Sequence, residues 1–376
     1  MAEPLKNLLN KVVIADMAKY FKRQYPEFDT TGFIKASTKN LTSLELKQRT
    51  DRIVEAMIKY LPIDFKKAGR ILRGSLGTAM NEQTSVTALD KNGISGWAIM
   101  PLTHYVGLRG QEHFDLSMRL LKEMTKRASS EYGVRYFLLA APEKTMAVLK
   151  TWTSDKNQHV RRLASEGCRP RLPWAMNLPL YIKNPKPVIE LLELLKDDDK
   201  EYVRRSVANN LNDIAKDHPE LIATIARCWM KGANTERKKL ITHACRTLIK
   251  QGHIKTLKIL GFDLPEIRRV NMDIMTPIVV FGDALQFSLS IDSACDQAQA
   301  LMIDYIVHHQ KANGSTSPKV FKWRNINLPA KKTLISTKTH TIKKITTRVY
   351  YPGLHRVEVM VNGMSVAIAD FELSMP

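Results

Sequence analysis

A short basic motif recurs along the chain, and this repetition constrains the fold more than any other feature. Residues 160–164 read Val-Arg-Arg-Leu-Ala, and residues 203–207 read Val-Arg-Arg-Ser-Val. Each copy follows an Asp-rich turn, and a third, weaker copy begins at Arg237. Copies spaced 34 to 43 residues apart are typical of paired helices that stack on one another. The spacing therefore predicts an all-α, HEAT-like helical solenoid, whose concave face is a long binding surface.

Helical patterns also fill the chain before these copies. Residues 42–45 read Thr-Ser-Leu-Glu, a capping box that predicts the start of a helix. Apolar residues at helical spacing indicate another helix over residues 111–127. Pro142 suits the first turn of a later helix, and Asp155 is predicted to cap the helix that carries the first basic motif. The N-terminal two thirds are thus expected to be helical.

From about Pro265 the pattern changes to short strands separated by turns. The dipeptide Asn362-Gly363 is typical of a tight hairpin. About seven strands in about 110 residues predict an all-β, immunoglobulin-like sandwich. The Cys–Trp–Cys pattern of antibody domains is missing, so the sandwich resembles the fibronectin type. We therefore expect two domains, a HEAT-like repeat domain over residues 1–262 and a β-sandwich over residues 265–376. The predicted strands lie within residues 286–292, 300–309, 319–328, 333–342 and 355–373.

The formal charge of the chain is +21, and it is unevenly distributed. Residues 263–376 hold 13 Lys or Arg and 10 Asp or Glu, which leaves +18 for residues 1–262. Such a balance favours polyanionic partners, such as nucleic acid or an anionic membrane, and assigns their binding mainly to the helical part. No run of residues is long and apolar enough to predict a membrane span, and no apolar signal core follows the N-terminus.

Four cysteines are present, at positions 168, 228, 245 and 295. None has the spacing of a metal site, and four thiols in a chain of this length do not indicate a disulfide framework. We therefore expect a reduced cytoplasmic protein without a metal centre.

The paired arginines are the first candidates for binding residues. Arg161 and Arg162 lie just inside one predicted helix, and Arg204 and Arg205 lie at the same place in the next copy. Guanidinium groups at equivalent places in stacked repeats would contact DNA phosphates at regular intervals. The alternative is that one arginine of each pair bridges to the preceding Asp-rich turn.

The loop after the first motif reads Cys-Arg-Pro-Arg-Leu-Pro-Trp. Its two prolines stiffen the segment that presents Arg169, Arg171 and Trp174. Arginine and tryptophan side chains together grip phosphates and stack on a base or a sugar. Alternatively, Trp174 is buried and packs the loop onto the repeats.

Two carboxylates are candidates for chemistry. Glu131 lies in the first turn of a predicted helix, where its ordinary role is to stabilise the helix dipole. Asp213 lies off the apolar stripe of its helix, on a polar face, and its ordinary role there is that of a solvated surface residue. Spacing alone does not decide between these roles and catalysis.

Longer motifs add a family resemblance. The chain resembles the AlkC/AlkD family of alkylpurine DNA glycosylases in two runs, HVRRLASEGCRPRLPWA and the preceding MTKRASSEYGVRYFL. It resembles the AlkC branch in particular in three others: the start MAEPLKNLLNK, the GW-x-x-MPL run at 96–102 and FDLSM at 114–118. The resemblance covers residues 1–262. The strand-rich tail is similar to the extra domain of some AlkC proteins. The dipeptide Tyr132-Gly133 departs from the Phe-Ala expected there.

The resemblance implies a fold and an activity. It implies a HEAT-like solenoid that removes cationic N3-alkylated bases, 3-methyladenine and 3-methylcytosine, from double-stranded DNA without a deep base-flipping pocket. It implies Glu131 and Asp213 as active-site carboxylates, Trp174 as an active-site aromatic residue and Arg162 as a DNA contact. Glu166 either joins the site or holds Arg162 through an i, i+4 pair. No metal or organic cofactor is implied, and the protein is expected to act as a monomer on nucleoid DNA.

A second reading of the same features stays open. A non-catalytic helical scaffold that binds DNA or an acidic protein would also explain the charge, the repeats and the sandwich. The two readings differ in geometry, because catalysis requires Glu131 and Asp213 to meet in one concave cleft near Trp174, whereas a scaffold does not.

Overall fold

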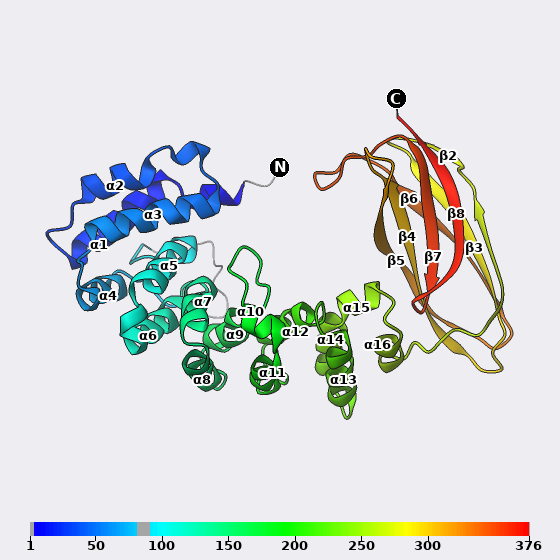
Figure 1. The fold of residues 1–376 in the computed structure, drawn as a ribbon, viewed down its shortest axis with the longest axis horizontal. Helices are drawn as coiled ribbons and strands as arrows, with labels where there is room; N and C mark the ends of the chain where they lie inside the picture. Colours follow the sequence, from blue (N-terminus) through cyan, green and yellow to red (C-terminus); the bar gives the residue numbers. More distant parts are fainter. Residues whose placement is uncertain (1–3, 81–90, 376) are drawn as a thin grey trace. The chain divides into compact units, whose positions relative to one another are not determined.

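The structure is a computed structural model, and it describes residues 4–80 and 91–375 (Figure 1). Helices occupy the described residues up to Ile259, and strands occupy those from Ile267 to Ser374. The predicted fold class, a helical solenoid followed by an all-β sandwich, is therefore confirmed. No helix within residues 4–80 and 91–375 is long and apolar enough to cross a membrane.

Sixteen α-helices lie within the described residues. Their bounds are α1 Lys11–Gln24, α2 Thr30–Thr38, α3 Leu46–Tyr60, α4 Phe65–Gly74, α5 Ile99–Arg109, α6 Phe114–Thr125, α7 Glu131–Ala140, α8 Pro142–Trp152, α9 Gln158–Gly167, α10 Pro179–Lys183, α11 Lys186–Glu193, α12 Glu201–Ile214, α13 Pro219–Met230, α14 Thr235–Ala244, α15 Arg246–Lys250 and α16 Ile254–Ile259. Short 3₁₀ helices are η1 Leu5–Leu8, η2 Leu41–Ser43, η3 Gly96–Ala98 and η4 Gln111–His113.

The helices form two rows, as expected for stacked repeats. Helices α3, α5, α7, α9, α12 and α14 pack side by side, each against the next. Helices α4, α6, α8 and α11 form further contacts with one another and with this row. The apolar stripe predicted for the second basic motif is the buried face of α12, since Val203, Val207, Leu211 and Ile214 are almost fully inaccessible. The row from α7 to α14 carries the repeated basic motifs.

Two predicted helix caps are wrong. The capping box at the start of α3 pairs Glu45 with Gln48 rather than Thr42 with Glu45, because residues 41–43 form a separate 3₁₀ turn. The N-cap of α9 is Asn157, whose side chain accepts the amide of His159. Asp155 lies two residues earlier, where it accepts the Asn157 amide. In both places the sequence offered two polar residues close together, and the nearer one forms the cap.

Eight strands of the described part of the chain form two sheets that enclose one apolar core. One sheet has the order β1-β3-β6 and the other β2-β8-β7-β4-β5; β2 runs parallel to β8, and the other neighbours are antiparallel. Strands β1 and β2 were not predicted. The bounds are β1 Ile267–Ile274, β2 Ile278–Val280, β3 Ala284–Ser293, β4 Gln299–Gln310, β5 Thr316–Leu328, β6 Thr333–Thr341, β7 Gly353–Val361 and β8 Met364–Ser374.

By their internal contacts, the described residues group into two units. One contains those of 1–217 and 234–244, and the other contains those of 218–233 and 245–376. Within the second unit, the predicted hairpin turn at Asn362-Gly363 lies against the helical segment. Asn362 Nδ2 donates to the carbonyls of Asp263 at 2.7 Å and Ala300 at 2.9 Å. A Cβ placed on Gly363 would lie 2.6 Å from the carbonyl oxygen of Gly252. The turn therefore needs both glycines.

Candidate active site

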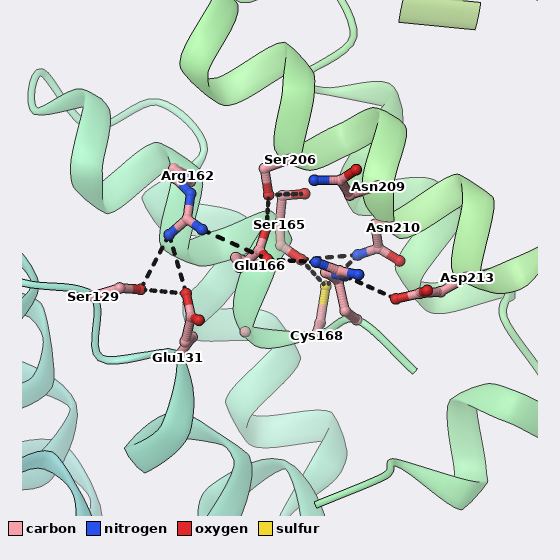
Figure 2. Close-up of polar contacts among 12 residues, drawn as sticks. Ser129, Glu131, Arg162, Ser165, Glu166, Cys168, Ser206, Asn209, Asn210 and Asp213 are labelled. Atoms are coloured by element: carbon pink, nitrogen blue, oxygen red, sulfur yellow. Dashed lines mark hydrogen bonds and ion pairs between the residues drawn. The ribbon is translucent and has the colours of Figure 1, made fainter. Parts of the chain in front are cut away.

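Glu131 is the first residue of α7, and its carboxylate is held from two sides. Ser129 Oγ donates to Glu131 Oε2 at 2.7 Å, and Arg162 Nη1 donates to the same oxygen at 3.0 Å (Figure 2). The Glu131 side chain keeps 29% of its surface exposed. An acidic residue suits the positive end of a helix dipole, which explains the local position. The remaining exposure leaves the carboxylate accessible to a ligand.

Glu131 lines an open cavity of about 370 Å³. Among the residues that the structure describes, four aromatic side chains, two methionines and one cation share this cavity with the carboxylate. The lining residues are Met80, Gly96, Trp97, Met100, Ala128, Ser129, Glu131, Tyr132, Arg162, Leu172, Pro173, Trp174, Ala175 and Tyr202. A carboxylate between aromatic faces is suited to a cation, because both attract positive charge.

Trp174 enters the cavity from the loop that follows α9. It is 64% exposed and has a φ of 66°, in the left-handed region that non-glycine residues rarely adopt. The predicted presentation of Trp174 on a stiff loop is thus what the structure shows, and the alternative of a buried packing residue is wrong.

Arg162 links the cavity to its surroundings. Its guanidinium lies over the ring of Tyr202 at 5.1 Å, and its Nη2 lies 3.5 Å from Glu166 Oε1, the predicted i, i+4 pair. Burial acts to lower the pKa of Arg162, but the neighbouring carboxylates of Glu131 and Glu166 raise it overall. Arg162 therefore lies against the carboxylate and the aromatic ring that attract positive charge in this cavity, Glu131 and Tyr202.

A buried ionic network continues from Glu166. Arg169 Nη1 donates to Glu166 Oε1 at 2.6 Å, and Arg169 Nε donates to Asp213 Oδ2 at 2.8 Å. Ser206 donates to the second oxygen of Glu166, also at 2.6 Å. Burial alone would raise the pKa of Glu166, but Arg162 and Arg169 lower it.

The expected solvated position of Asp213 is wrong, because this residue is only 2% exposed. It lies beneath Arg169, which comes from a loop 44 residues earlier. Asp213 does not line the cavity that contains Glu131 and Trp174, so the predicted meeting of the two carboxylates in one cleft is wrong for the protein in this structure. The two predicted carboxylates are instead joined through a chain of ion pairs that runs through Arg162, Glu166 and Arg169.

The arginines of each repeated pair differ from one another. Arg161 donates to the Asp155 carbonyl of the preceding turn at 3.0 Å and to the Asp198 carboxylate of the next turn at 2.6 Å. Arg204 donates to the Asp198 carbonyl of its preceding turn at 2.6 Å and to Glu236 at 2.8 Å. The first arginine of each pair thus ties a turn in place, as the alternative reading held. Arg205 is exposed and forms no ion pair with the residues that the structure describes.

Arg171 lies outside the cavity, where it forms a two-point pair with Asp217 at 2.9 Å. Among residues 4–80 and 91–375, no three His, Cys, Asp or Glu side chains come together in a way that could hold a metal ion.

Comparison with known proteins assigns the chain to a family. Residues 268–375 match the family model described as "Uncharacterised protein YhaZ, C-terminal Ig-like domain". The chain is 36% identical to the protein YhaZ of Bacillus subtilis (strain 168) over 98% of its own length and 99% of that protein. It is 34% identical to the solved alkylpurine DNA glycosylase AlkC of Pseudomonas fluorescens, bound to DNA containing an abasic site analog. That likeness has a TM-score of 0.86 and covers 99% of this chain and 100% of the other. The chain belongs to the AlkC family.

AlkC family membership confirms the resemblance predicted from the motifs, and the immunoglobulin-like match confirms the class of the sandwich. Several cavity residues of this AlkC-family chain were not predicted as site residues. Trp97 and Met100 lie in the GW-x-x-MPL motif, and Tyr132 directly follows Glu131. Tyr202 directly precedes the second basic motif, and His159 directly precedes the first. The centroids of their two rings lie 5.4 Å apart. An aromatic residue directly before both copies of the motif is a sequence pattern that could have identified Tyr202.

Proposed function

We propose that this chain is a DNA glycosylase that starts base excision repair by hydrolysing the N-glycosidic bond of alkylated bases in double-stranded DNA. The observation that carries the proposal is the accessible carboxylate of Glu131 in an aromatic-walled cavity. It stands in a chain related along its whole length to an alkylpurine DNA glycosylase. The proposed substrates are cationic N3-alkylated bases, 3-methyladenine and 3-methylcytosine.

The chemistry of these substrates suits the cavity. An N3-alkylated base already carries positive charge, so it takes the electron pair of the breaking C1′–N bond and leaves as a neutral molecule without a general acid. The positive charge passes to the sugar, which becomes an oxocarbenium ion. A carboxylate near C1′ stabilises this ion and accepts a proton from the attacking water. The reaction requires no metal or organic cofactor.

Glu131 is the proposed carboxylate that acts directly, since it already faces the cavity. Asp213 is the second proposed catalytic carboxylate. In this structure Arg169 covers Asp213. We propose that Arg169 turns towards a DNA phosphate when DNA binds, and that this movement uncovers Asp213 for the sugar. Trp174 is proposed to lie against the sugar or the base, and Glu166 holds Arg162 and Arg169 in register between the two carboxylates.

The cations on the same row of helices are proposed to bind the DNA backbone. Arg162, Arg205 and Lys239 occupy the same position in three successive copies of the basic motif. Lys239 is 69% exposed, and with Arg205 it lines a second cavity of about 210 Å³. Arg171 contributes a contact from the loop. Arg161 and Arg204, which stabilise turns, hold these side chains in place. We further propose that the protein acts as a monomer in the bacterial cytoplasm, on nucleoid DNA.

The test measures base release under single-turnover conditions from duplexes that contain 3-methyladenine or 3-methylcytosine. The wild type is expected to release the base, and Glu131→Gln and Asp213→Asn are expected to lower the rate constant by at least about 100-fold each. Glu190→Gln is the control, because this exposed glutamate pairs with Lys150 and lies outside the cavity. Circular dichroism checks that each variant is folded.

Two results contradict parts of the proposal. If Glu131→Gln and Asp213→Asn both keep the wild-type rate constant, the catalytic assignment is wrong. If the wild type binds DNA and releases no base from either lesion, the non-catalytic scaffold is the correct reading.

A further inference from the structure

Arg135 is a charged residue in an unusual position. It lies on α7 and is fully buried, with 0% of its surface exposed. A buried cation is normally held by a carboxylate, since removing a charge from water is costly. The hydrogen bonds of Arg135 among the described residues go instead to main-chain carbonyls. Burial lowers its pKa to about 10, so the guanidinium stays charged at neutral pH.

The carbonyls that Arg135 binds lie at both ends of one loop. Nη1 donates to Gly167 at 3.0 Å and to Arg169 at 2.7 Å, where the loop leaves α9. Nε donates to Met176 at 2.7 Å, and Nη2 donates to the same oxygen. The guanidinium therefore joins the start of the loop to its end. The segment between these ends includes Trp174, which lines the cavity.

The loop has few other main-chain bonds to fix its shape. Ala175 donates to Leu172 at 3.3 Å, and Leu178 donates to Pro170 at 3.0 Å. Trp174 itself has a left-handed backbone, with a φ of 66°, which is unfavourable for a residue with a side chain. Such a conformation persists only where the surrounding structure holds it. The ion pairs of Arg169 and Arg171 hold the first part of the loop, and the four hydrogen bonds of Arg135 add support at both of its ends.

Arg135 also follows Glu131 by four residues on the same helix, so the two lie one turn apart. Helix α7 thus presents the carboxylate to the cavity at its first residue and fixes the tryptophan loop one turn later. The relative position of carboxylate and indole is set within a single rigid element.

We propose that Arg135 is a positioning residue for the candidate site, which acts through the loop to place Trp174 against the nucleotide that Glu131 serves. The proposal rests on the proposed glycosylase function. The arginine does not touch the substrate. A lysine at this position keeps the charge but presents one ammonium group, which does not span carbonyls at both ends of the loop.

The experiment compares Arg135→Lys with Arg49→Lys. Arg49 is also buried, at 5% exposure, and donates to the carbonyls of Lys6, Leu9 and Leu44. It therefore matches Arg135 in chemistry, but it supports the N-terminal segment. Arg135→Lys is expected to lower the single-turnover rate constant about 10- to 100-fold, since small misplacements of site groups have effects of this size. Affinity for undamaged duplex should change less than about threefold. Arg49→Lys should lower the thermal midpoint and leave the rate constant within about twofold.

Two further measurements separate positioning from loss of stability. In a Trp174→Phe background, Arg135→Lys is expected to have little additional effect on the rate constant. The indole that Arg135 positions is already absent there. The fluorescence of Trp174 is the part of the signal that is lost in Trp174→Phe. Its quenching by acrylamide should increase in Arg135→Lys, and this measurement does not require activity.

The inference is overturned if Arg135→Lys keeps the wild-type rate constant, if the effects of Arg135→Lys and Trp174→Phe multiply, or if Arg49→Lys slows the reaction equally. Unchanged quenching also overturns it. These results differ from a failure of the proposed function, in which the wild type itself releases no base while the quenching difference persists.

Discussion

The buried network between Glu166 and Asp213 supports a quantitative prediction about Arg169. Arg169 forms ion pairs with both carboxylates, and the three side chains are 8%, 5% and 3% exposed, in the order Arg169, Glu166 and Asp213. Substituting Arg169→Met removes the shared cation and leaves two buried negative charges. Breaking a buried pair in this way costs about 3–5 kcal/mol.

The remaining partners place the expected cost of this substitution at the lower end of that range. Glu166 keeps a hydrogen bond from Ser206 at 2.6 Å and a weaker pair with Arg162 at 3.5 Å. Asp213 keeps Lys216 at 3.1 Å. We therefore expect a loss of about 3 kcal/mol, which lowers the thermal midpoint of the helical part by about 6–12 °C.

The loss should also depend on pH. In the wild type, the neighbouring arginines lower the pKa of Glu166 below its ordinary 4.5. Its contribution to stability is therefore present above pH 4.5 and is lost as the pH falls through the folded pKa. In Arg169→Met, Glu166 loses one of the two arginines that offset its burial, so the pKa of Glu166 rises. The variant then takes up protons when it folds, and this uptake stabilises the folded state at lower pH. The loss of stability relative to the wild type should therefore become smaller as the pH falls from about 7 to about 5.

Far-UV circular dichroism during thermal unfolding measures this deficit at the two pH values. Arg171→Met is the matched control, because Arg171 lies in the same loop and pairs with Asp217 at the surface. Its midpoint should stay at the wild-type value. Equal losses for the two variants, or a deficit for Arg169→Met that stays constant with pH, would refute the reasoning.

Two other predictions concern charge elsewhere in the chain. Burial lowers the pKa of His309 to about 3 and that of His340 to about 4, so the unfolded chain binds protons that the folded sandwich resists. The stability of the sandwich, followed by near-UV circular dichroism, should therefore fall as the pH drops from about 6.5 towards 4, and a flat profile would contradict this. Arg205→Gln and Lys239→Gln should each reduce the slope of log affinity against log salt concentration by about 1 and leave the single-turnover rate constant unchanged, whereas Lys150→Gln on α8 should leave the slope at its wild-type value.

The sequence predicted the two fold classes well because both depend on local periodicity. The apolar stripe of α12 and the turn at Asn362-Gly363 are encoded by residues close together in the chain. Strands β1 and β2 escaped prediction. β1 pairs with β3, β2 pairs with β8, and their outer faces are largely exposed. Their identity as strands depends on partners distant in the sequence.

The candidate site was harder to predict for the same reason. The helical spacing of Asp213 indicated a polar face, but it did not reveal that this face lies under Arg169. Arg135 is one basic residue among many in the sequence, and its bonds to loop carbonyls 32 to 41 residues away depend on the packing of α7 against α9. The two adjacent arginines of each pair also have different roles, because only the first of them lies within reach of an Asp-rich turn.

The glycine contact at the hairpin turn of the sandwich has a consequence for how such chains diverge. Gly252 and Gly363 approach so closely that a Cβ on either would lie within 2.8 Å of the other's main-chain oxygen. Neither position therefore accepts a side chain while the other segment stays in place. If sandwiches are exchanged between relatives, hybrids should retain their stability only when the donor brings a glycine at the turn and the recipient keeps its own. Across homologues, the two positions should change together or not at all.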